Sequence, residues 1–558
     1  MKMKALLGTA ALAVTFGATS AMAQTAISLG HLADYSGATS DVGTPFGQGV
    51  ADAFAYVNKN GGINGAKVNV DTVDYGYQVP RAIAQYKKWS GGEKVSAILG
   101  WGTADTEALK KFVAEDKIPD ISGSYSAALS DPTGAGGKTE AAPYNFFYGP
   151  SYSDALRGML TWAAEDWKSK GKSGKPKYVH MGANHPYPNA PKAAGEAIAA
   201  ELGFEVLPAI VFALTPGDYS AQCLTLKSSG ANYAYLGNTA GSNISVLNAC
   251  KAAGADVQFM GNVWGMDENA AKAAGAAADG VVFPLRTAVA WGGNAPGMKT
   301  MQDISKMSDA AGTAYRPVHY VAGVCTALYM KEAVEWAAKN GGATGENVKK
   351  GFYQKKDWVP AGMDGVCNPS TWTDKDHRPT MKVDIYRMKV SGATDAAVAD
   401  LVKNGAIKLE KVKTVDLPRK AAIAAGFCGV LLVLKPGMGG DAFGYYVGLA
   451  AGVLMGLFFI ANRKLAALSP PLLNVTHNAL VGSIVLSAFL PLFWHTPPQA
   501  VWGKLGALIG LAVVGQALMI SAFMFAPAGV IAPFTYGMLV FAAIIGYVAF
   551  GTFPDALT

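Results

Sequence analysis

The sequence predicts an α/β protein with parallel sheets over residues 24–416, followed by an all-α membrane segment of about five transmembrane helices over residues 421–558. In the first part, short apolar runs alternate with amphipathic stretches, as in parallel sheets that helices cover on both faces. After Lys420 only four basic and two acidic side chains remain, a composition typical of membrane spans. A chain of 558 residues is also too long for a single hydrophobic core.

Composition and motifs exclude several function classes. A net charge of +7 without a dense basic stripe argues against a nucleic-acid partner. The sequence has no CxxC, HExxH or histidine cluster, so no metal site is expected. It also lacks a P-loop, a nucleophile elbow and a dinucleotide fingerprint, and we expect neither a cofactor nor enzymatic activity.

The first 23 residues have the pattern of a bacterial signal peptide. Met1–Lys4 is a short positive stretch, Ala5–Phe16 is an apolar run, and Ala21–Ala23 is a cleavage site with small residues at both ends. An uncleaved membrane anchor is the alternative, which the short apolar run disfavours. We therefore expect the mature chain to begin at Gln24 in the periplasm.

The elements of residues 24–416 follow from hydrophobic periodicity. Expected strands are 26–31, 67–75, 95–100, 118–121, 178–182, 205–213, 233–236 and 257–260. Expected helices are 47–58, 80–90, 106–116, 191–202, 220–229 and 244–253. Strands joined by helices of this length imply right-handed crossovers and parallel sheets.

Three loops that follow predicted strands are suited to holding a ligand: Asp34–Gly43, Trp101–Asp105 and Ser122–Ser126. Ligands of parallel sheets collect at the carboxyl ends of strands. There, backbone N–H groups and a helix N-terminus hold a carboxylate without a fixed cation. Helix capping by Ser and Thr is the alternative for any one residue, but three such loops at one sheet edge favour a binding site.

Four cysteines, Cys223, Cys250, Cys325 and Cys367, lie in the part expected to be exported. An oxidising compartment permits disulfides, and four cysteines allow three pairings. Cys223 and Cys250 fall in successive predicted helices that can be neighbours on one face of a sheet, which favours Cys223–Cys250 and Cys325–Cys367. Free buried thiols are the alternative. Cys428 is expected to be a small hydrophobe in an apolar run.

Eight short motifs follow one another along residues 24–416. They are Ser36-Gly37, Asn58–Lys67, Asp74-Tyr75, Gly100–Thr103, His185–Asn189, Asp218–Ser220, Asp376–Pro379 and Val383–Tyr386. Their order and spacing resemble the type I periplasmic solute-binding proteins of the branched-chain amino acid ABC-transporter class. The resemblance implies a two-lobed type I periplasmic-binding-protein fold made of two parallel-sheet α/β sandwiches. Lobe 1 is expected at about 24–148 and 283–376, and lobe 2 at about 149–282 and 380–416, with three crossovers between them.

The resemblance also places ligand contacts in both lobes. In lobe 1 the residues expected to hold a carboxylate are Trp101, Gly102, Thr103, Ser122, Ser124 and Tyr125. In lobe 2 the residues expected to close over the ligand are Tyr187, Asn238, Trp264 and Asp267. Such proteins bind a solute by lobe closure and present it to a membrane permease.

The ligand class depends on whether an acid points into the site. An amino acid needs an anion for its ammonium group, which Asp267 or Glu268 can supply, with a helix-start role as the alternative. The rings of Trp101, Tyr125, Tyr187 and Trp264 suit an apolar side chain or an aromatic carboxylate. Without an inward-pointing acid, a ligand that has no amine is favoured. Short amides and urea remain possible ligands.

Five apolar stretches predict membrane helices at 421–434, 442–461, 472–494, 505–525 and 530–550. Three motifs, Arg419–Gly437, Ala526–Phe534 and Gly551–Leu557, resemble the EamA domain of drug/metabolite transporters. Most of the first repeat of that family is missing, which implies a partial domain without the two halves of a transport pathway.

The charges that flank the spans conflict with export. The basic residues at 411–420 and Arg463-Lys464 favour a cytoplasmic location, whereas the signal peptide places the connector at 417–420 outside. We expect the exported domain to prevail, because large domains translocate largely regardless of charge.

Together these features predict the extracytoplasmic substrate-binding component of an ABC-type importer, which captures a branched-chain or other apolar amino acid or a similar small carboxylate. Its expected partners are an ABC permease in the inner membrane and the lipid bilayer, through a tether at residues 421–558. The alternative is a membrane permease or sensor of the EamA type with a fused ligand-binding domain.

Overall fold

The computed structural model describes residues 26–135 and 139–417, and scattered positions between 480 and 515 that include the short helix η4 (Gln499–Val501). The predicted signal peptide, residues 418–420 of the connector and most of the predicted membrane segment lie outside the described residues. The chain divides into the units Met1–Leu417 and Pro418–Thr558. Of the helices that the structure describes, none has the length and hydropathy to cross a membrane.

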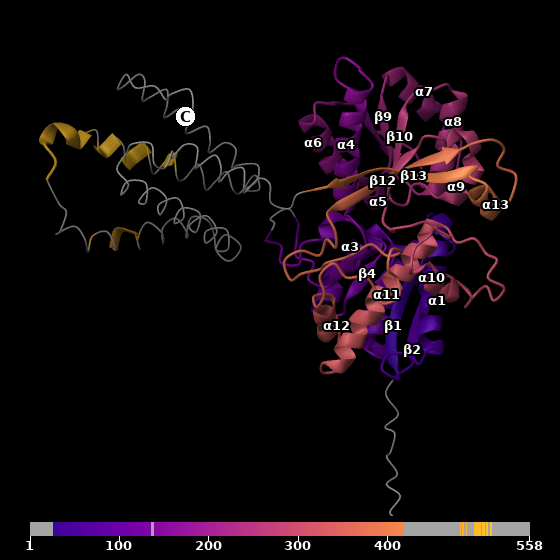
Figure 1. Cartoon of the computed structure of the whole chain (residues 1–558). Helices are drawn as coiled ribbons and strands as arrows, with labels where there is room; N and C mark the ends of the chain where they lie inside the picture. The colour runs from indigo at the N-terminus through magenta and orange to yellow at the C-terminus, as the bar shows by residue number, and fades with distance from the viewer. Residues whose placement is uncertain are drawn as a thin grey trace, which may run out of the picture. The chain divides into compact units, whose positions relative to one another are not determined.

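Lobe 1 contains a parallel sheet with the strand order β2-β1-β3-β4-β5 in the described residues (Figure 1). Its strands are β1 (Ile27–Ala33), β2 (Val68–Asp74), β3 (Ala97–Gly100), β4 (Asp120–Ser122) and β5 (Asn145–Phe147). The central strands β3 and β4 are buried throughout, as expected for a parallel sheet covered on both faces.

The helices of lobe 1 come from two distant parts of the chain. The first part supplies α1 (Ser40–Lys59), α2 (Val79–Lys88), the π-helix η1 (Trp89–Glu93), α3 (Thr103–Asp116) and η2 (Ala127–Leu129). The second part supplies α10 (Met298–Ser305), α11 (Val318–Lys339) and α12 (Gly345–Phe352). Helix α11 packs along α1, and this contact joins the two parts into one lobe.

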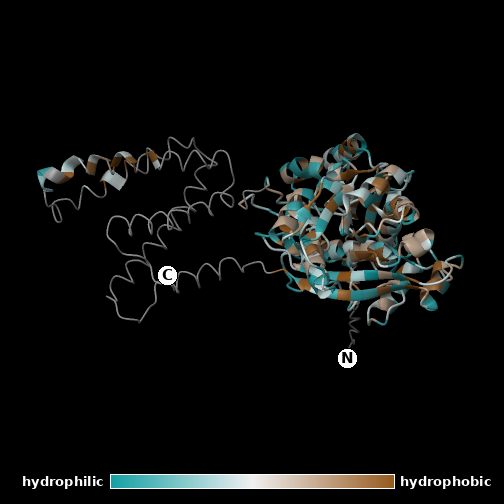
Figure 2. Cartoon of the chain, turned by 90° about the horizontal axis from the view of Figure 1, so that it is seen from above, coloured by the Kyte–Doolittle hydropathy of each residue, from teal (hydrophilic) through white to brown (hydrophobic). Residues whose placement is uncertain are grey.

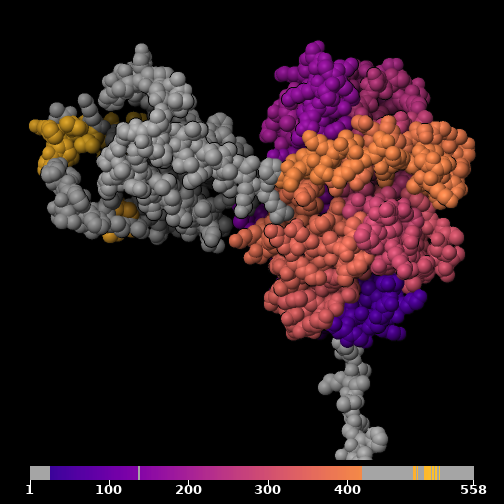
Figure 3. Space-filling view, in the orientation of Figure 1, coloured from indigo at the N-terminus to yellow at the C-terminus, as the bar shows by residue number. Residues whose placement is uncertain are grey.

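Lobe 2 contains a mixed sheet with the order β13-β12-β11-β10-β9-β6-β7, in which β8 pairs with β6. Its strands are β6 (Lys177–Gly182), β7 (Glu205–Val206), β8 (Ile210–Val211), β9 (Tyr233–Leu236), β10 (Gln258–Gly261), β11 (Val282–Leu285), β12 (Lys382–Val390) and β13 (Ile407–Asp416). Strands β12 and β13 are antiparallel to their neighbours. They belong to the orange band across the front in Figure 3.

The helices of lobe 2 are α4 (Tyr152–Ser169), α5 (Pro186–Asn189), α6 (Lys192–Glu201), α7 (Ser220–Ser229), α8 (Ala240–Ala252), α9 (Glu268–Ala274), η3 (Gly275–Ala277) and α13 (Val398–Lys403). Many helices of the binding unit carry both hydrophilic and hydrophobic segments (Figure 2). This amphipathic pattern fits helices that cover a sheet with one face and meet water with the other.

Several boundaries differ from the sequence prediction. The strand predicted at 205–213 is split into β7 and β8, because Pro208 has no N–H to donate to a sheet. Helix α1 begins at Ser40, before Pro45, whereas the prediction started after that proline. Strand β11 lies in the sheet of lobe 2 up to Leu285, beyond the expected lobe boundary at residue 282.

The basic stretch that precedes the connector is part of the fold. Lys411 and Lys413 belong to β13, where they pair with Tyr386 and Ile385 of β12. The Lys411 ammonium also lies 2.8 Å from the Asp384 carboxylate. These lysines therefore have structural partners inside the binding unit.

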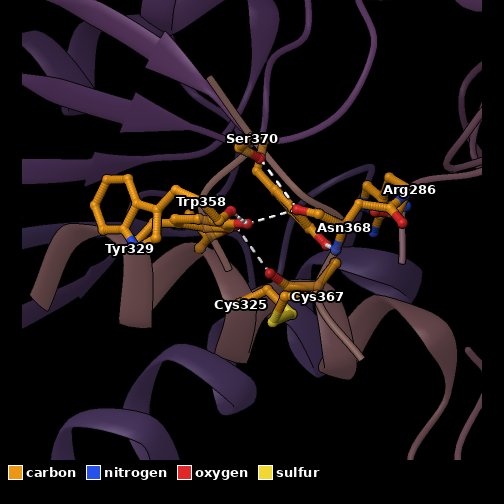
Figure 4. Close-up of a disulfide and its surroundings, with 10 residues drawn as sticks. Arg286, Cys325, Tyr329, Trp358, Cys367, Asn368 and Ser370 are labelled. Atoms are coloured by element: carbon orange, nitrogen blue, oxygen red, sulfur yellow. Dashed lines mark hydrogen bonds between the residues drawn. A yellow bond between two sulfur atoms is a disulfide. The ribbon is translucent and has the colours of Figure 1, made fainter. Parts of the chain in front are cut away.

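The structure contains the disulfides Cys223–Cys250 and Cys325–Cys367, which is the pairing expected from the sequence. Cys223–Cys250 joins α7 to α8 in lobe 2. Figure 4 shows Cys325 of α11 bonded to Cys367, next to Asn368, whose side chain donates to the Arg286 carbonyl at 3.0 Å. The second disulfide thus ties α11 to a segment that contacts the end of β11.

Removing the second disulfide is expected to destabilise the binding unit. Cys325→Ser with Cys367→Ser opens a loop with a sequence separation of 42 residues, and loss of such a crosslink typically lowers the free energy of unfolding by about 2–4 kcal/mol. Chemical denaturation of the full chain measures the change. The control is Cys428→Ser, which removes a thiol outside both disulfides. An unchanged midpoint in the double variant would contradict the prediction.

Candidate ligand-binding site

The three predicted loops of lobe 1 meet at one edge of its sheet. Buried Asp34 accepts hydrogen bonds from the Thr39 backbone N–H at 3.0 Å and hydroxyl at 2.6 Å. The Trp101 indole N–H donates to the Thr39 hydroxyl at 2.9 Å, and the Ser124 hydroxyl donates to that of Thr103 at 2.9 Å. The loops after β1, β3 and β4 therefore form one hydrogen-bonded surface.

The Gly102 amide is bonded within lobe 1. Its N–H lies 3.2 Å from both the Asp105 carboxylate and the Tyr75 hydroxyl. A Cβ on Gly102 would lie 2.0 Å from the Tyr77 ring, so glycine is needed for the close approach of that tyrosine. Tyr77 has a φ of 57°, a left-handed conformation that is rare for an aromatic residue and often marks a functional loop.

Asn238 and Asn262 brace the loops of lobe 2. The Asn238 side chain accepts from the Ala183 N–H at 2.8 Å and donates to the Ala213 carbonyl at 2.7 Å. The Tyr187 hydroxyl donates to the Asn262 side chain at 3.0 Å. Asn238, in the loop after β9, therefore bonds to the loops after β6 and β8.

A small cavity lies where the loops of the two lobes meet. Its lining residues are Thr39, Tyr77, Trp101, Gly102, Thr103, Gly123, Tyr152, Tyr187, Thr239 and Trp264. Its volume of about 10 Å³ is roughly the room that one water molecule needs. A larger ligand therefore requires the lobes to part or the aromatic side chains to move.

The structure brings together five of the ten residues predicted to contact ligand: Trp101, Gly102, Thr103, Tyr187 and Trp264. The other five, which lie outside the lining, are Ser122, Ser124, Tyr125, Asn238 and Asp267. Two further lining residues, Thr39 and Gly123, lie in loops that were predicted to hold a ligand, although neither was named as a contact. The prediction missed Tyr77, Tyr152 and Thr239. Tyr77 follows the Asp74-Tyr75 motif and Tyr152 follows the expected lobe boundary at residue 148, so both were close to recognised signals.

Asp267 is the N-cap residue that precedes helix α9, and it does not line the cavity. Its carboxylate accepts from the Ala270 N–H at 2.7 Å as the N-cap. Its other oxygen lies 3.6 Å from the His319 Nε2. Of the two roles that the sequence left open for Asp267, this geometry corresponds to the helix-start carboxylate.

Two carboxylates bond to a helix start in the opposite lobe. Asp41 of lobe 1 accepts from the Gly241 N–H at 2.5 Å, in the first turn of α8. Glu268 of lobe 2 accepts from the Val318 N–H at 3.3 Å, at the start of α11. The first N–H groups of a helix have no partner within the helix, and an acid there also interacts favourably with the helix dipole. These contacts, here called the interlobe caps, form only when the lobes are together.

Lobe closure is expected to take up protons near neutral pH. Burial with the neighbouring Glu268 raises the pKa of Asp267, which is 3% exposed, to about 7. In parted lobes, water would return this pKa toward 3.8. The closed form then binds more protons, so it gains stability relative to the open form as the pH falls.

Ligand affinity should therefore rise when the pH is lowered from about 8 to about 6. Calorimetry in buffers of different ionisation enthalpy measures both the affinity and the proton uptake. Proton release on binding, or an affinity that falls on acidification, would contradict the prediction.

The sequence prediction also missed Arg286, which follows β11 where the chain leaves the sheet of lobe 2. Its side chain donates to the Val263 carbonyl at 2.8 Å and lies 3.0 Å from the His319 Nδ1. The guanidinium carbon is 3.8 Å from the centre of the Trp264 ring, and the residue is only 1% exposed. A charged residue directly after a short apolar strand was the available sequence signal.

Among the described residues, no group of three or more His, Cys, Asp or Glu side chains is placed to hold a metal ion. The fold and the site instead define a two-lobed binding protein, whose loops meet over a small aromatic cavity.

Comparison with known proteins identifies the family. The family model described as "Periplasmic binding protein" matches residues 26–395, which is most of the chain, and the chain belongs to this family. A model of the EamA-like transporter family matches residues 442–558, in agreement with the second resemblance. Among curated proteins, none matches the chain.

Three of the solved structures with a similar fold are described as proteins of ABC transporters. A substrate-binding protein of an ABC transporter from Aeropyrum pernix is 26% identical with a TM-score of 0.58, over 72% of this chain and 98% of that chain. A branched-chain amino acid ABC transporter protein from Thermus thermophilus with bound valine is 20% identical with a TM-score of 0.61, over 73% and 100%. A fatty acid ABC transporter substrate-binding protein from Thermomonospora curvata is 19% identical with a TM-score of 0.58, over 70% and 92%.

Proposed function

We propose that residues 24–417 capture a small carboxylate by lobe closure and deliver it to an ABC-type importer. The observation that carries the proposal is the cavity at the lobe boundary, which residues of both lobes line. Only closure brings two such surfaces together around one ligand, and hinge closure is the usual motion of periplasmic binding proteins.

The chemistry of the lining supports a carboxylate. The cavity touches the start of α3, a helix of 14 residues whose first residue is Thr103. A helix start offers free N–H groups and a favourable dipole to an anion. The Thr103 hydroxyl, which accepts from Ser124, can donate its own proton to a carboxylate, while the indole rings of Trp101 and Trp264 suit an apolar body.

We place the binding unit in the periplasm, with an inner-membrane ABC permease as its partner, and residues 421–558 in the bilayer as a tether. The signal-peptide pattern and the family match support this placement. A reporter enzyme fused after Thr558 tests it. With a translocated connector and five spans the reporter should be cytoplasmic, and a periplasmic reporter would refute the arrangement.

A binding screen on the full chain tests the proposed function. The panel contains the proteinogenic amino acids and aliphatic and aromatic carboxylates, and the readouts are thermal stabilisation and calorimetric affinity. We expect at least one small carboxylate to bind with micromolar or tighter affinity, and no binding by any compound of the panel would overturn the proposal.

Thr103→Val removes a lining hydroxyl at nearly constant volume. It should weaken the affinity by roughly three- to ten-fold, the usual effect of one lost hydrogen bond. The control Thr225→Val lies on the exposed face of α7 and should have no effect.

The match of the EamA model to residues 442–558 favours a second candidate, a permease or sensor in which the binding unit delivers ligand to its own membrane segment. Uptake of the ligand by the full chain, in cells that lack other permeases for it, would support this candidate. Absence of uptake in cells that display the folded chain would count against it.

A further inference from the structure

Arg286 is a buried cation that forms no ion pair with a carboxylate in the part of the chain that the structure describes. Its Nε has no hydrogen-bond partner there either. Taking a guanidinium out of water without an opposite charge is costly. Stacking on Trp264 and the hydrogen bond to Val263 offset part of this cost. The guanidinium therefore lacks a direct carboxylate partner, and an anion that bonds to its Nε would supply one.

Trp264 contacts both the cavity and Arg286. It is one of the residues that line the cavity, and its ring stacks on the guanidinium. Its indole N–H donates to the Tyr152 hydroxyl at 3.1 Å. Its ring centre lies 4.7 Å from that of Trp101 in lobe 1. When the lobes part, the contact with Trp101 is lost, and a ligand that displaces Trp264 reaches Arg286.

Contacts with neighbouring segments hold the backbone of Arg286 in place, while its guanidinium lies beside the rings of Tyr125 and Trp264. Asn368 donates to its carbonyl (Figure 4), and the Cys325–Cys367 disulfide holds the Asn368 segment to α11. A Cβ on Gly149 would lie 3.0 Å from the Arg286 Cβ. The chain at residue 149, where lobe 1 was expected to give way to lobe 2, therefore also packs tightly against Arg286. The backbone that carries the guanidinium is thus held by a hydrogen bond, a nearby disulfide and close packing.

The lining itself supplies no anion for an ammonium group, because none of the residues that line the cavity is acidic. The nearest carboxylates lie behind the lining, where Asp34 accepts from Thr39 and Asp105 accepts from Gly102. Arg286 can only donate hydrogen bonds, so His319 accepts through Nδ1 and directs its protonated Nε2 toward Asp267. His319 therefore lies between Arg286 and Asp267, and the Asp267 carboxylate is also bonded at the start of α9.

We propose that Arg286 binds the carboxylate of the ligand after Trp264 is displaced, and that the ligand is an apolar or aromatic carboxylate without an ammonium group. This inference rests on the proposed solute-binding function and names its substrate class. An α-amino acid is disfavoured because its ammonium group would lie near a guanidinium, while the cavity lining itself supplies no acid to balance it. A neutral amide is disfavoured because it leaves the buried cation uncompensated.

Three probes of one shape test the substrate class on the full chain. They are 3-phenylpropanoate, phenylalanine, which adds an ammonium group, and 3-phenylpropanamide, which removes the charge. The aliphatic pair 4-methylpentanoate and leucine repeats the first comparison. We expect each amine-free carboxylate to bind at least about ten-fold more tightly than its amino acid and its amide, as for a charged hydrogen bond.

Variants of Arg286 test the residue. Arg286→Met keeps most of the side-chain length without the charge and should weaken binding of 3-phenylpropanoate by about ten-fold or more. Arg286→Lys should restore part of the affinity. The control is Arg316→Met, which removes another arginine stacked on an aromatic ring, 4.6 Å from the centre of Tyr320, and outside the cavity lining. Circular dichroism confirms that each variant is folded.

The outcomes separate this inference from the proposed function. If phenylalanine or leucine binds as tightly as its amine-free analogue, the inference is wrong while the solute-binding function stands. The same holds if a folded Arg286→Met variant binds 3-phenylpropanoate like the unaltered chain. If Arg286→Met does not fold, the affinities of the unaltered chain for the amine-free carboxylates and for their amino acids decide whether the proposed substrate class is right. If no compound in the wider panel binds, both the proposed function and this inference fail.

Discussion

Gly323→Leu is expected to destabilise lobe 1 by at least about 3 kcal/mol, because α1 and α11 touch through their backbones at this position. A Cβ on Gly323 would lie 2.1 Å from the Phe46 carbonyl oxygen, and one on Gly49 would lie 2.3 Å from that of Tyr320. Backbone atoms cannot move aside as the end of a side chain does. The helices must therefore separate, which loosens the contact that joins the two parts of lobe 1.

Denaturant unfolding of the full chain measures this effect. Gly323→Ala should show a smaller loss of about 1–3 kcal/mol. The control Gly91→Ala adds a Cβ that meets no atom within 4 Å, and it should change stability by less than about 1 kcal/mol. Equal stability of Gly323→Leu and the unaltered chain would show that α1 and α11 do not pack as described.

Asp41→Ala is expected to weaken ligand affinity by roughly three- to ten-fold, because it removes an interlobe cap. The Gly241 N–H lies at an exposed position, so the variant loses the Asp41 acceptor in the closed form and leaves this N–H to water in both forms. Asp41→Asn keeps an acceptor oxygen and removes the charge. It should retain the affinity at neutral pH, because its amide oxygen still accepts from the Gly241 N–H.

The control for this pair is Asp218→Ala. Asp218 also bonds to a helix start, through the Ser220 N–H at 2.9 Å, but both residues lie in lobe 2 and do not change partners on closure. Calorimetry with 3-phenylpropanoate compares the three variants. If Asp41→Ala binds as tightly as Asp218→Ala, the interlobe cap does not contribute to closure.

The sequence predicted helices and strands correctly where the hydrophobic periodicity was clear. The helix at 220–229 and the strand at 233–236 have the bounds that were expected. Periodicity failed where one residue changed the backbone, as at Pro208 between β7 and β8. It also gave no sign that α11 packs on α1, because this contact joins segments far apart in the chain.

The candidate site was only half predictable, because loop position does not determine side-chain direction. Ser122 follows a strand, as expected of a ligand contact, yet its hydroxyl bonds to the Ser124 carbonyl. Tyr77 was missed because its position depends on a left-handed backbone and on the close approach to Gly102. Arg286 was missed because an isolated arginine belongs to no motif, and its role depends on Trp264 and His319 from distant segments.

The distance between the lobes, measured with and without ligand, tests binding by closure most directly. One spin label is placed at Lys87 on α2 in lobe 1 and one at Ser228 on α7 in lobe 2, both exposed, in a chain with Cys428→Ser. The structural cysteines are in disulfides. Saturating 3-phenylpropanoate is predicted to shift the distance distribution toward a single, shorter separation. An unchanged distribution under conditions in which calorimetry shows the site to be filled would contradict capture by lobe closure.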